Sequence, residues 1–255
     1  DWHWDFNTGC EYVGNQGSHE VVVARWFLDE STIAPRTTSI GGRFGYDDAG
    51  NTATTQIVFH DYEKAPLLFE VRGLPKSKAD QKNWGKSMDK LRGAQIGVIA
   101  QCEKGHVLIN DYQQARAYNK DGDVVEHWKG AGNHFANFLQ AVRSRKMSDL
   151  NADILEGHIS SSLCHTGNIS HRLGTNASAE DIAGEISSNE LFSDSLQRML
   201  SHLQANEIDL DQTELTLGTS LEFDPRTELC TNNNRGNELL KREYRKPFVV
   251  PDLST

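Results

Sequence analysis

The sequence predicts an α+β protein with a large open, mainly antiparallel β-sheet and helices packed on one face of it. Three observations carry this prediction. An apolar helical segment lies near the N-terminus, seven strand-like segments follow with short turns between them, and helical segments fill most of the second half. Strands and helices do not alternate along the chain, as they do in parallel sheets, so the order is typical of an α+β fold.

The N-terminal region combines aromatic residues, a glycine-rich loop and a helix. Trp2, Trp4 and Phe6 alternate with polar residues, so as an extended strand they would present three rings on one side, suited either to stacking on a sugar or to core packing. A loop with Gly9, Gly14 and Gly17 follows. Residues 18–28 are apolar nearly all round, which predicts a buried helix capped by Ser18.

The centre of the chain reads as successive strands at residues 37–44, 51–60, 67–72, 95–102, 106–110, 115–118 and 124–128. Turn residues at 48–51, 104–105 and 120–123 predict hairpins, and therefore antiparallel neighbours. In the third strand Leu67, Phe69 and Val71 make one face apolar. Such a face needs a cover, so we expect a homodimer or homotetramer formed through the sheet.

Helical spacing of apolar residues resumes after the strands. It predicts helices at residues 133–145, 152–173 and 178–204, the last broken near Ser193. The tail from residue 215 reads as irregular chain with one short helix at 237–244 and an extended end at 246–251. We interpret residues 1–255 as a single domain.

Composition excludes several classes of partner. The net charge of −10 argues against nucleic acid, which needs clustered Lys and Arg, and no apolar run approaches the length that spans a membrane.

The four cysteines form no C-x-x-C pair, so we expect neither a metal site nor a disulfide framework. No G-x-G-x-x-G follows a strand, so no dinucleotide-binding residues are expected on this chain.

Four polar residues are candidates for a ligand site. Asn15 and His19 stand in the loop and first turn of the predicted first helix, where unpaired backbone N–H groups suit polar ligands. His158 and His165 share one face of the predicted helix 152–173, so they could line one wall of a cavity. The alternatives are helix capping with a structural histidine in the first case, and a solvated polar face in the second.

Several motifs together resemble the Gfo/Idh/MocA family of sugar and inositol oxidoreductases, in the part that follows their Rossmann domain. The resemblance covers essentially the whole chain. It rests on NQGSH at residues 15–19 with ARW at 24–26, HFANF and AVRSR at 134–145, ADI and EGH at 152–158, LCH and GNI at 163–169, and KREYRKPFVVP at 241–251.

The resemblance implies that this chain is the C-terminal substrate-binding and oligomerisation domain of an enzyme that uses NAD or NADP on a sugar or polyol. It implies that the N-terminal dinucleotide-binding domain is missing here, that the chain alone is inactive, and that the parent enzyme is cytoplasmic unless an upstream segment directs export. His19 matches the family's acid/base histidine, and we expect Asn15, His158, His165 and Trp4 to bind the substrate.

Two departures from the family pattern weaken the expected acid/base arrangement. Asn15 replaces a common aspartate, and Val22 replaces an aspartate three positions after the histidine. An amide can orient a hydroxyl but cannot take its proton. Residues 63–66 imitate the family's Glu-Lys-Pro motif, which belongs to the Rossmann domain, and a hairpin turn explains them better.

Two other functions stay open. One is a noncatalytic module for sugar binding or assembly. The other is a redox-assisted glycoside hydrolase or lyase, a chemistry that the same family resemblance permits.

Overall fold

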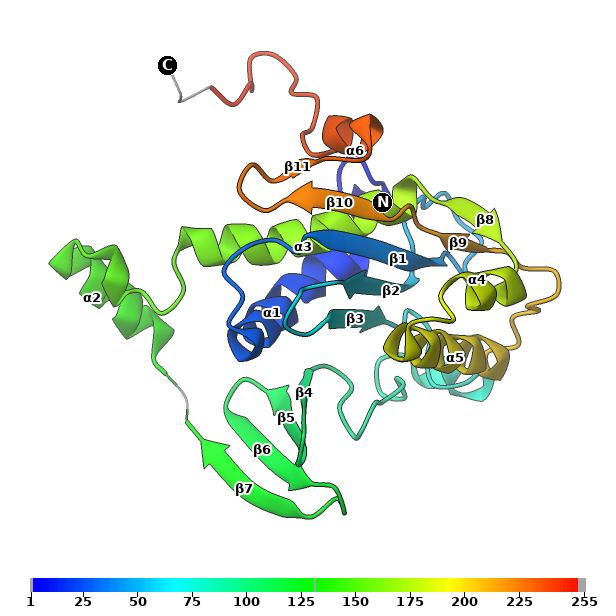
Figure 1. The fold of residues 1–255 in the computed structure, drawn as a ribbon, viewed down its shortest axis with the longest axis horizontal. Coiled ribbons are helices and arrows are strands. Elements are labelled where there is room, and N and C mark those ends of the chain that lie inside the picture. The colour runs from blue at the N-terminus through cyan, green and yellow to red at the C-terminus, as the bar shows by residue number, and fades with distance from the viewer. Residues whose placement is uncertain (1, 131, 252–255) are drawn as a thin grey trace.

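The computed structural model describes residues 2–130 and 132–251 and has the α+β class that the sequence predicts (Figure 1). Every pairing between its named strands is antiparallel, and both sheets are open. The larger sheet has the order β11-β10-β1-β2-β3, and β9 joins β8 to β1. Its strands are β1 (Arg36–Gly42), β2 (Thr55–His60), β3 (Leu67–Val71), β8 (Thr175–Ala177), β9 (Leu215–Leu217), β10 (Leu221–Asp224) and β11 (Leu229–Cys230).

Helices cover both faces of this sheet, whereas one covered face was expected. The physical reason lies in β2, where every residue is buried. Val58 belongs to a core formed with α1 (Glu11–Leu28) and α3 (Ile154–Arg172). Ile57 and Phe59 point the other way, into a core formed with α4 (Ala179–Glu185) and α5 (Glu190–Ala205). Alternate residues of one strand therefore build two cores.

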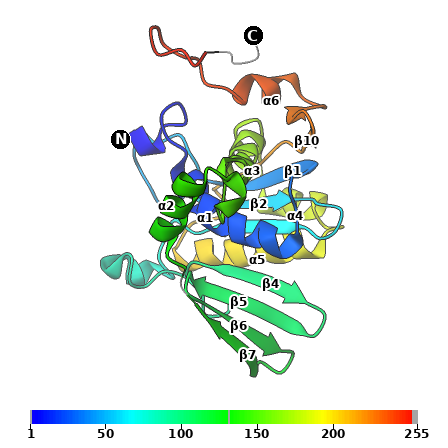
Figure 2. The ribbon, with the colours of Figure 1, turned by 90° about the vertical axis from the view of Figure 1, so that its left-hand side faces the viewer.

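The remaining strands form a separate sheet, so the single broad sheet expected from the sequence divides in two. Its order is β4-β5-β6-β7, with β4 (Val98–Cys102), β5 (Gly105–Asp111), β6 (Gln114–Asn119) and β7 (Val124–Lys129). The hairpin turns predicted at 104–105 and 120–123 are confirmed. A long connection after β3, with the short helix Lys78–Asn83, carries the chain away from the first sheet, and Figure 2 shows the second sheet projecting below it.

The first helix begins earlier than the sequence suggests. It starts at Glu11, so Gly14 and Gly17 lie within a helix and not in a loop. Close packing explains these glycines, since a Cβ added at Gly17 would stand 2.8 Å from the sulfur of Cys164 in α3. The α1 and α3 helices run antiparallel, with Arg25 near Ser160 at one end and Cys10 near Asn168 at the other.

The second half departs from its prediction in two places. The predicted helix 178–204 divides at residues 186–189, a little before the break expected near Ser193, giving α4 and α5. The tail contributes strands β9, β10 and β11 to the larger sheet, where irregular chain was expected. Its helix, α6 (Asn234–Leu239), overlaps the predicted helix 237–244 but begins three residues and ends five residues earlier. The helix α2 (His134–Ser144) and the 3-10 helix Met147–Asp149 precede α3.

The N-terminal aromatic residues do not form the expected strand. Trp2–Trp4 is a turn of 3-10 helix, which the next residues stabilise because the Thr8 hydroxyl donates to the Trp2 carbonyl at 2.7 Å. Their rings therefore do not share one side as a strand would arrange them. Arg172 and Arg242 each lie about 5 Å from the Phe6 ring, at 5.1 and 4.8 Å.

Candidate functional site

Asn15 and His19 lie one turn apart on α1, and both are exposed. Because α1 begins at Glu11, and not at Ser18 as predicted, helix-end amides can no longer be the reason to expect a ligand at Asn15 and His19. Backbone N–H groups expected to be unpaired at residues 14–19 lie inside the helix, where Gly14 N donates to the Cys10 carbonyl at 2.9 Å. A ligand at this surface would therefore meet side chains and not helix-end amides.

A contact from the second sheet closes one side of this surface, and it could not be seen in the sequence. Tyr112, in the β5–β6 turn, donates from its hydroxyl to Glu20 Oε1 at 2.6 Å. Gln16 Nε2 donates to both Glu20 oxygens at 3.0 Å. The Glu20 side chain is buried, whereas the Tyr112 ring is exposed and its centroid lies 6.4 Å from that of His19.

This network sets the chemistry of Tyr112. Desolvation, followed by the hydrogen bond and charge of Glu20, raises the pKa of Tyr112 to about 12. The phenol therefore stays neutral near neutral pH, and its bond to Glu20 fixes the ring beside His19. Together, Asn15, His19 and Tyr112 offer an amide, an imidazole and an aromatic face. Such a set can hydrogen-bond a hydroxyl group and stack on an apolar sugar face.

The two candidate histidines of α3 engage other parts of the chain. His158 lies 2.7 Å from Glu228, in the turn between β10 and β11. Desolvation, with a smaller contribution from the Arg242 guanidinium, lowers the pKa of His165. His19 faces the β5–β6 turn instead, so the contacts of these three imidazoles do not converge.

Trp4 is half-buried, and its ring and carbonyl contact neighbouring residues. Its ring meets Tyr12 edge-on with centroids 4.9 Å apart, and the Arg43 guanidinium lies 5.2 Å from its centroid. Its carbonyl accepts from Asn51 N at 3.0 Å and from Thr52 Oγ1 at 3.1 Å. Trp4 therefore holds the N-terminal segment against the sheet.

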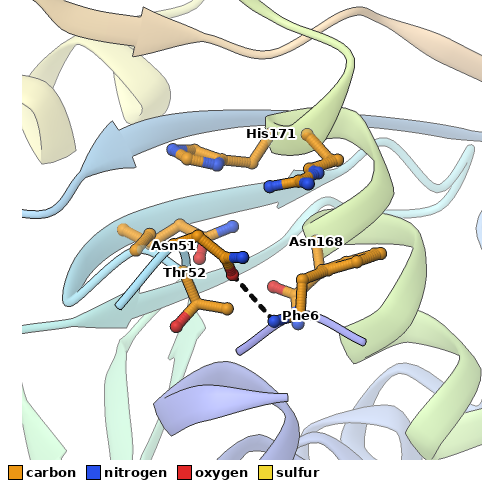
Figure 3. Close-up of a pocket in the computed structure, with 8 residues that line it drawn as sticks. Phe6, Asn51, Thr52, Asn168 and His171 are labelled. Carbon is orange, nitrogen blue, oxygen red and sulfur yellow. Dashed lines mark hydrogen bonds between the residues drawn. The ribbon is translucent and has the colours of Figure 1, made fainter. Parts of the chain in front are cut away.

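A small polar cavity lies beneath that segment (Figure 3). Phe6 and Asn51 stand at its edge, where Phe6 N donates to Asn51 Oδ1 at 2.8 Å, while Asn168 and His171 project from α3. Its volume is about 10 Å³, which is about the space of one water molecule. Burial lowers the pKa of His171 to about 4, so its ring is neutral.

A wider depression of about 470 Å³ lies beside the turn between β2 and β3, bordered by Glu30, Tyr62, Lys64 and Pro225. The hairpin turn predicted for residues 63–66 is confirmed. Lys64 donates to the Leu28 carbonyl at 2.9 Å, so it ties this turn to the end of α1.

The described residues contain neither a Rossmann-type dinucleotide cradle nor a cluster of metal ligands. A dinucleotide cradle needs a strand, a glycine-rich turn and a helix in a parallel unit, and the strands pair only antiparallel. Within residues 2–130 and 132–251, no group of three or more His, Cys, Asp or Glu side chains could hold a metal ion. No helix in this part of the chain has the length and apolar character needed to cross a bilayer.

No protein-family model matches the sequence, and no curated protein matches it. The family resemblance therefore stays a prediction from the motifs.

Proposed function

We propose that this chain is the substrate-binding and oligomer-forming C-terminal part of a cytoplasmic NAD(P)-dependent oxidoreductase that acts on a sugar or polyol. The observation that carries the proposal is the exposed surface of α1, where His19 and Asn15 lie one turn apart beside the fixed ring of Tyr112. Asn15 and His19 belong to the motif at residues 15–19 that resembles the oxidoreductase family.

In this proposal His19 exchanges a proton with the reacting hydroxyl or carbonyl oxygen of the substrate, since imidazole readily does so near neutral pH. Asn15 orients a neighbouring hydroxyl through its amide, and Tyr112 supports the sugar ring. His158, His165 and Trp4 make contacts elsewhere, so we propose no part for them in substrate binding or proton transfer at this surface. Residues outside this chain would hold the nicotinamide.

Exposed apolar side chains on α2 and at the start of α3 support a covering domain or subunit. On α2 they recur at helical spacing and form one stripe, and the start of α3 adds two more. Phe135 is 72% exposed and Ile154 is 84% exposed. Figure 1 shows α2 standing clear of the body. The set is Phe135, Phe138, Leu139, Val142, Ile154 and Leu155. Apolar patches of this kind commonly mark interfaces.

The surface proposed for oligomerisation differs from the strand first considered. Leu67, Phe69 and Val71 pack into the core beneath α1 and α3, so they need no partner. All residues of β7 are exposed, among them Val125 and Trp128. We therefore propose that a homodimer or homotetramer forms through the β4–β7 sheet.

The test uses the longer reading frame that would include a dinucleotide-binding domain, assayed with NAD⁺ or NADP⁺ and a panel of sugars and polyols. His19→Ala should lower kcat at least about 100-fold, the scale of a lost acid/base group. His158→Ala, on the same protein, should change it less than about twofold. Nicotinamide turnover by residues 1–255 alone, or equal losses in both variants, would contradict the proposal.

A further inference from the structure

Three of the residues that line the cavity beneath the N-terminal segment each have a buried polar atom without a hydrogen-bond partner in the part of the chain that the structure describes. Gln56 Oε1, Asn168 Oδ1 and His171 Nε2 are buried and have no hydrogen-bond partner among the described residues. Gln56 comes from β2, and the other two come from α3. Buried polar atoms nearly always have a partner, so three of them around one cavity point to a ligand.

The neighbours of Gln56 fix which end of its amide is unpaired. Ser39 Oγ donates its only proton to the Ile57 carbonyl at 3.0 Å, so it accepts from Gln56 Nε2 at 2.8 Å. The Gly167 carbonyl, at 3.4 Å, can also only accept from that nitrogen. Both contacts require the NH₂ group where it stands. The unpaired atom of Gln56 is therefore the carbonyl oxygen, an acceptor.

Asn168 and His171 present acceptors as well. Asn168 Nδ2 donates to the Cys10 carbonyl at 3.4 Å, which leaves the side-chain oxygen as the unpaired atom. The His171 ring hydrogen-bonds the backbone of Gly41, and burial keeps the ring neutral by lowering its pKa. In a neutral imidazole only one nitrogen carries a proton. Donation to the Gly41 carbonyl therefore leaves Nε2 as an acceptor.

We infer that this cavity is a binding site for one ordered water molecule, which donates hydrogen bonds to acceptors from β2 and α3. Water is the small neutral molecule that brings two donors, and the volume of about 10 Å³ suits one such molecule. Arg172 also lines the cavity, so its charge disfavours an ammonium ion and its N–H groups can donate to the water oxygen. The site depends only on the fold and not on the proposed function.

The experiment is water–protein NOE spectroscopy on the isotope-labelled chain. A long-lived cross-peak should join water to the side-chain amide protons of Asn168. Ala53 lines the cavity, so Ala53→Val should fill it and abolish that cross-peak, whereas Ala94→Val, at a buried alanine elsewhere, should leave it unchanged. The wild-type spectrum decides the matter even if Ala53→Val does not fold.

Three results would overturn the inference. One is a folded wild-type chain with no long-lived water cross-peak at Asn168. Another is a cross-peak that persists unchanged in folded Ala53→Val. The third is a ¹⁵N-filtered cross-peak from added ¹⁵N-ammonium at the same protons, which would identify a cation as the ligand.

Discussion

The Tyr112 hydroxyl and the buried Glu20 carboxylate are joined by a 2.6 Å hydrogen bond across 92 positions of the sequence. This contact ties the turn of the second sheet to α1, beside His19. It is also the feature that makes Tyr112 part of the candidate site, because it sets the direction in which the exposed ring points.

Tyr112→Phe should weaken the contact between the β5–β6 turn of the second sheet and α1. The change leaves the ring but removes a hydrogen bond to a buried charged group, so the free energy of unfolding should fall by about 1–2 kcal/mol. Amide exchange in the β5–β6 turn should also speed up. Denaturant unfolding and hydrogen-exchange mass spectrometry measure the two effects. Tyr244→Phe in the C-terminal tail is the control, and equal effects in both variants would contradict the expected role.

Arg25→Leu should be among the most destabilising single changes. The Arg25 side chain is 1% exposed and its guanidinium bonds Glu156 at 3.1 Å, Ser160 at 2.9 Å and the Glu30 carbonyl at 2.8 Å. Removing one partner from a buried ion pair costs about 3–5 kcal/mol, and we expect the lower end because Glu156 retains some contact with water. Chemical denaturation measures the loss.

Arg36→Leu is the matched comparison for Arg25. Arg36 and Asp61 lie 3.5 Å apart, but their side chains are 55% and 40% exposed. Solvent screens such a pair, so the loss should stay below about 1 kcal/mol. If Arg36→Leu lowered the free energy of unfolding as much as Arg25→Leu, burial would not be what sets the strength of these ion pairs.

Two glycines of α3 should respond to alanine in opposite directions. A Cβ at Gly167 would stand 2.6 Å from Val58 Cγ1, so Gly167→Ala should destabilise the protein by about 1–3 kcal/mol. A Cβ at Gly157 would meet nothing within 4 Å, so Gly157→Ala should stabilise it by up to about 1 kcal/mol through helix propensity. Thermal or denaturant unfolding reports both, and the same sign for both would contradict the packing described.

Mild acid should destabilise the fold. Burial lowers the pKa of His60 to about 3 and that of His171 to about 4, each from 6.5. As the pH falls, the unfolded chain therefore binds these protons before the folded chain does. The contribution of the two neutral histidines to the free energy of unfolding is fully present above about pH 6.5 and falls as the pH drops toward 4. Each histidine contributes about 1.4 kcal/mol per pH unit within that window.

Denaturant unfolding between pH 8 and pH 4.5 measures this slope. His60→Gln should reduce the slope by the contribution of one histidine. The free energy of unfolding of this variant at pH 8 gives the packing cost of the substitution separately. A slope that His60→Gln leaves unchanged would show that this histidine is not buried in its neutral form.

Local chemistry predicted much of the fold. Turn residues and alternation indicated the strands from residue 37 to 128, and apolar spacing indicated α2 and α3. The start of α1 was missed because Gly14 and Gly17 read as loop residues. Close contacts, with Cys10 at Gly14 and with Cys164 at Gly17, explain these glycines within a helix. The strands of the tail were missed because two to four residues carry too little pattern, and because β9 and β10 pair with β1, which is distant in sequence.

The candidate site was predictable only in part. Asn15 and His19 could be proposed from their motif, because both belong to one local segment. Tyr112 and Glu20 carried no such signal, since a lone tyrosine in a turn and a lone glutamate in an apolar helix are ordinary residues. Their relationship arises when the second sheet meets α1, and neither spacing nor composition contains that information.

The antiparallel pair of α1 and α3 has a consequence for synthesis on the ribosome. Arg25 and Ser160, which hydrogen-bond, are 135 positions apart. At about 5–20 residues per second, the interval between them takes roughly 7 to 27 seconds. During that time α1 lacks its cover, and so does the hairpin of β1 and β2 once the chain has been made to residue 60. Newly made chains would thus expose this surface to chaperones or aggregation until α3 is made.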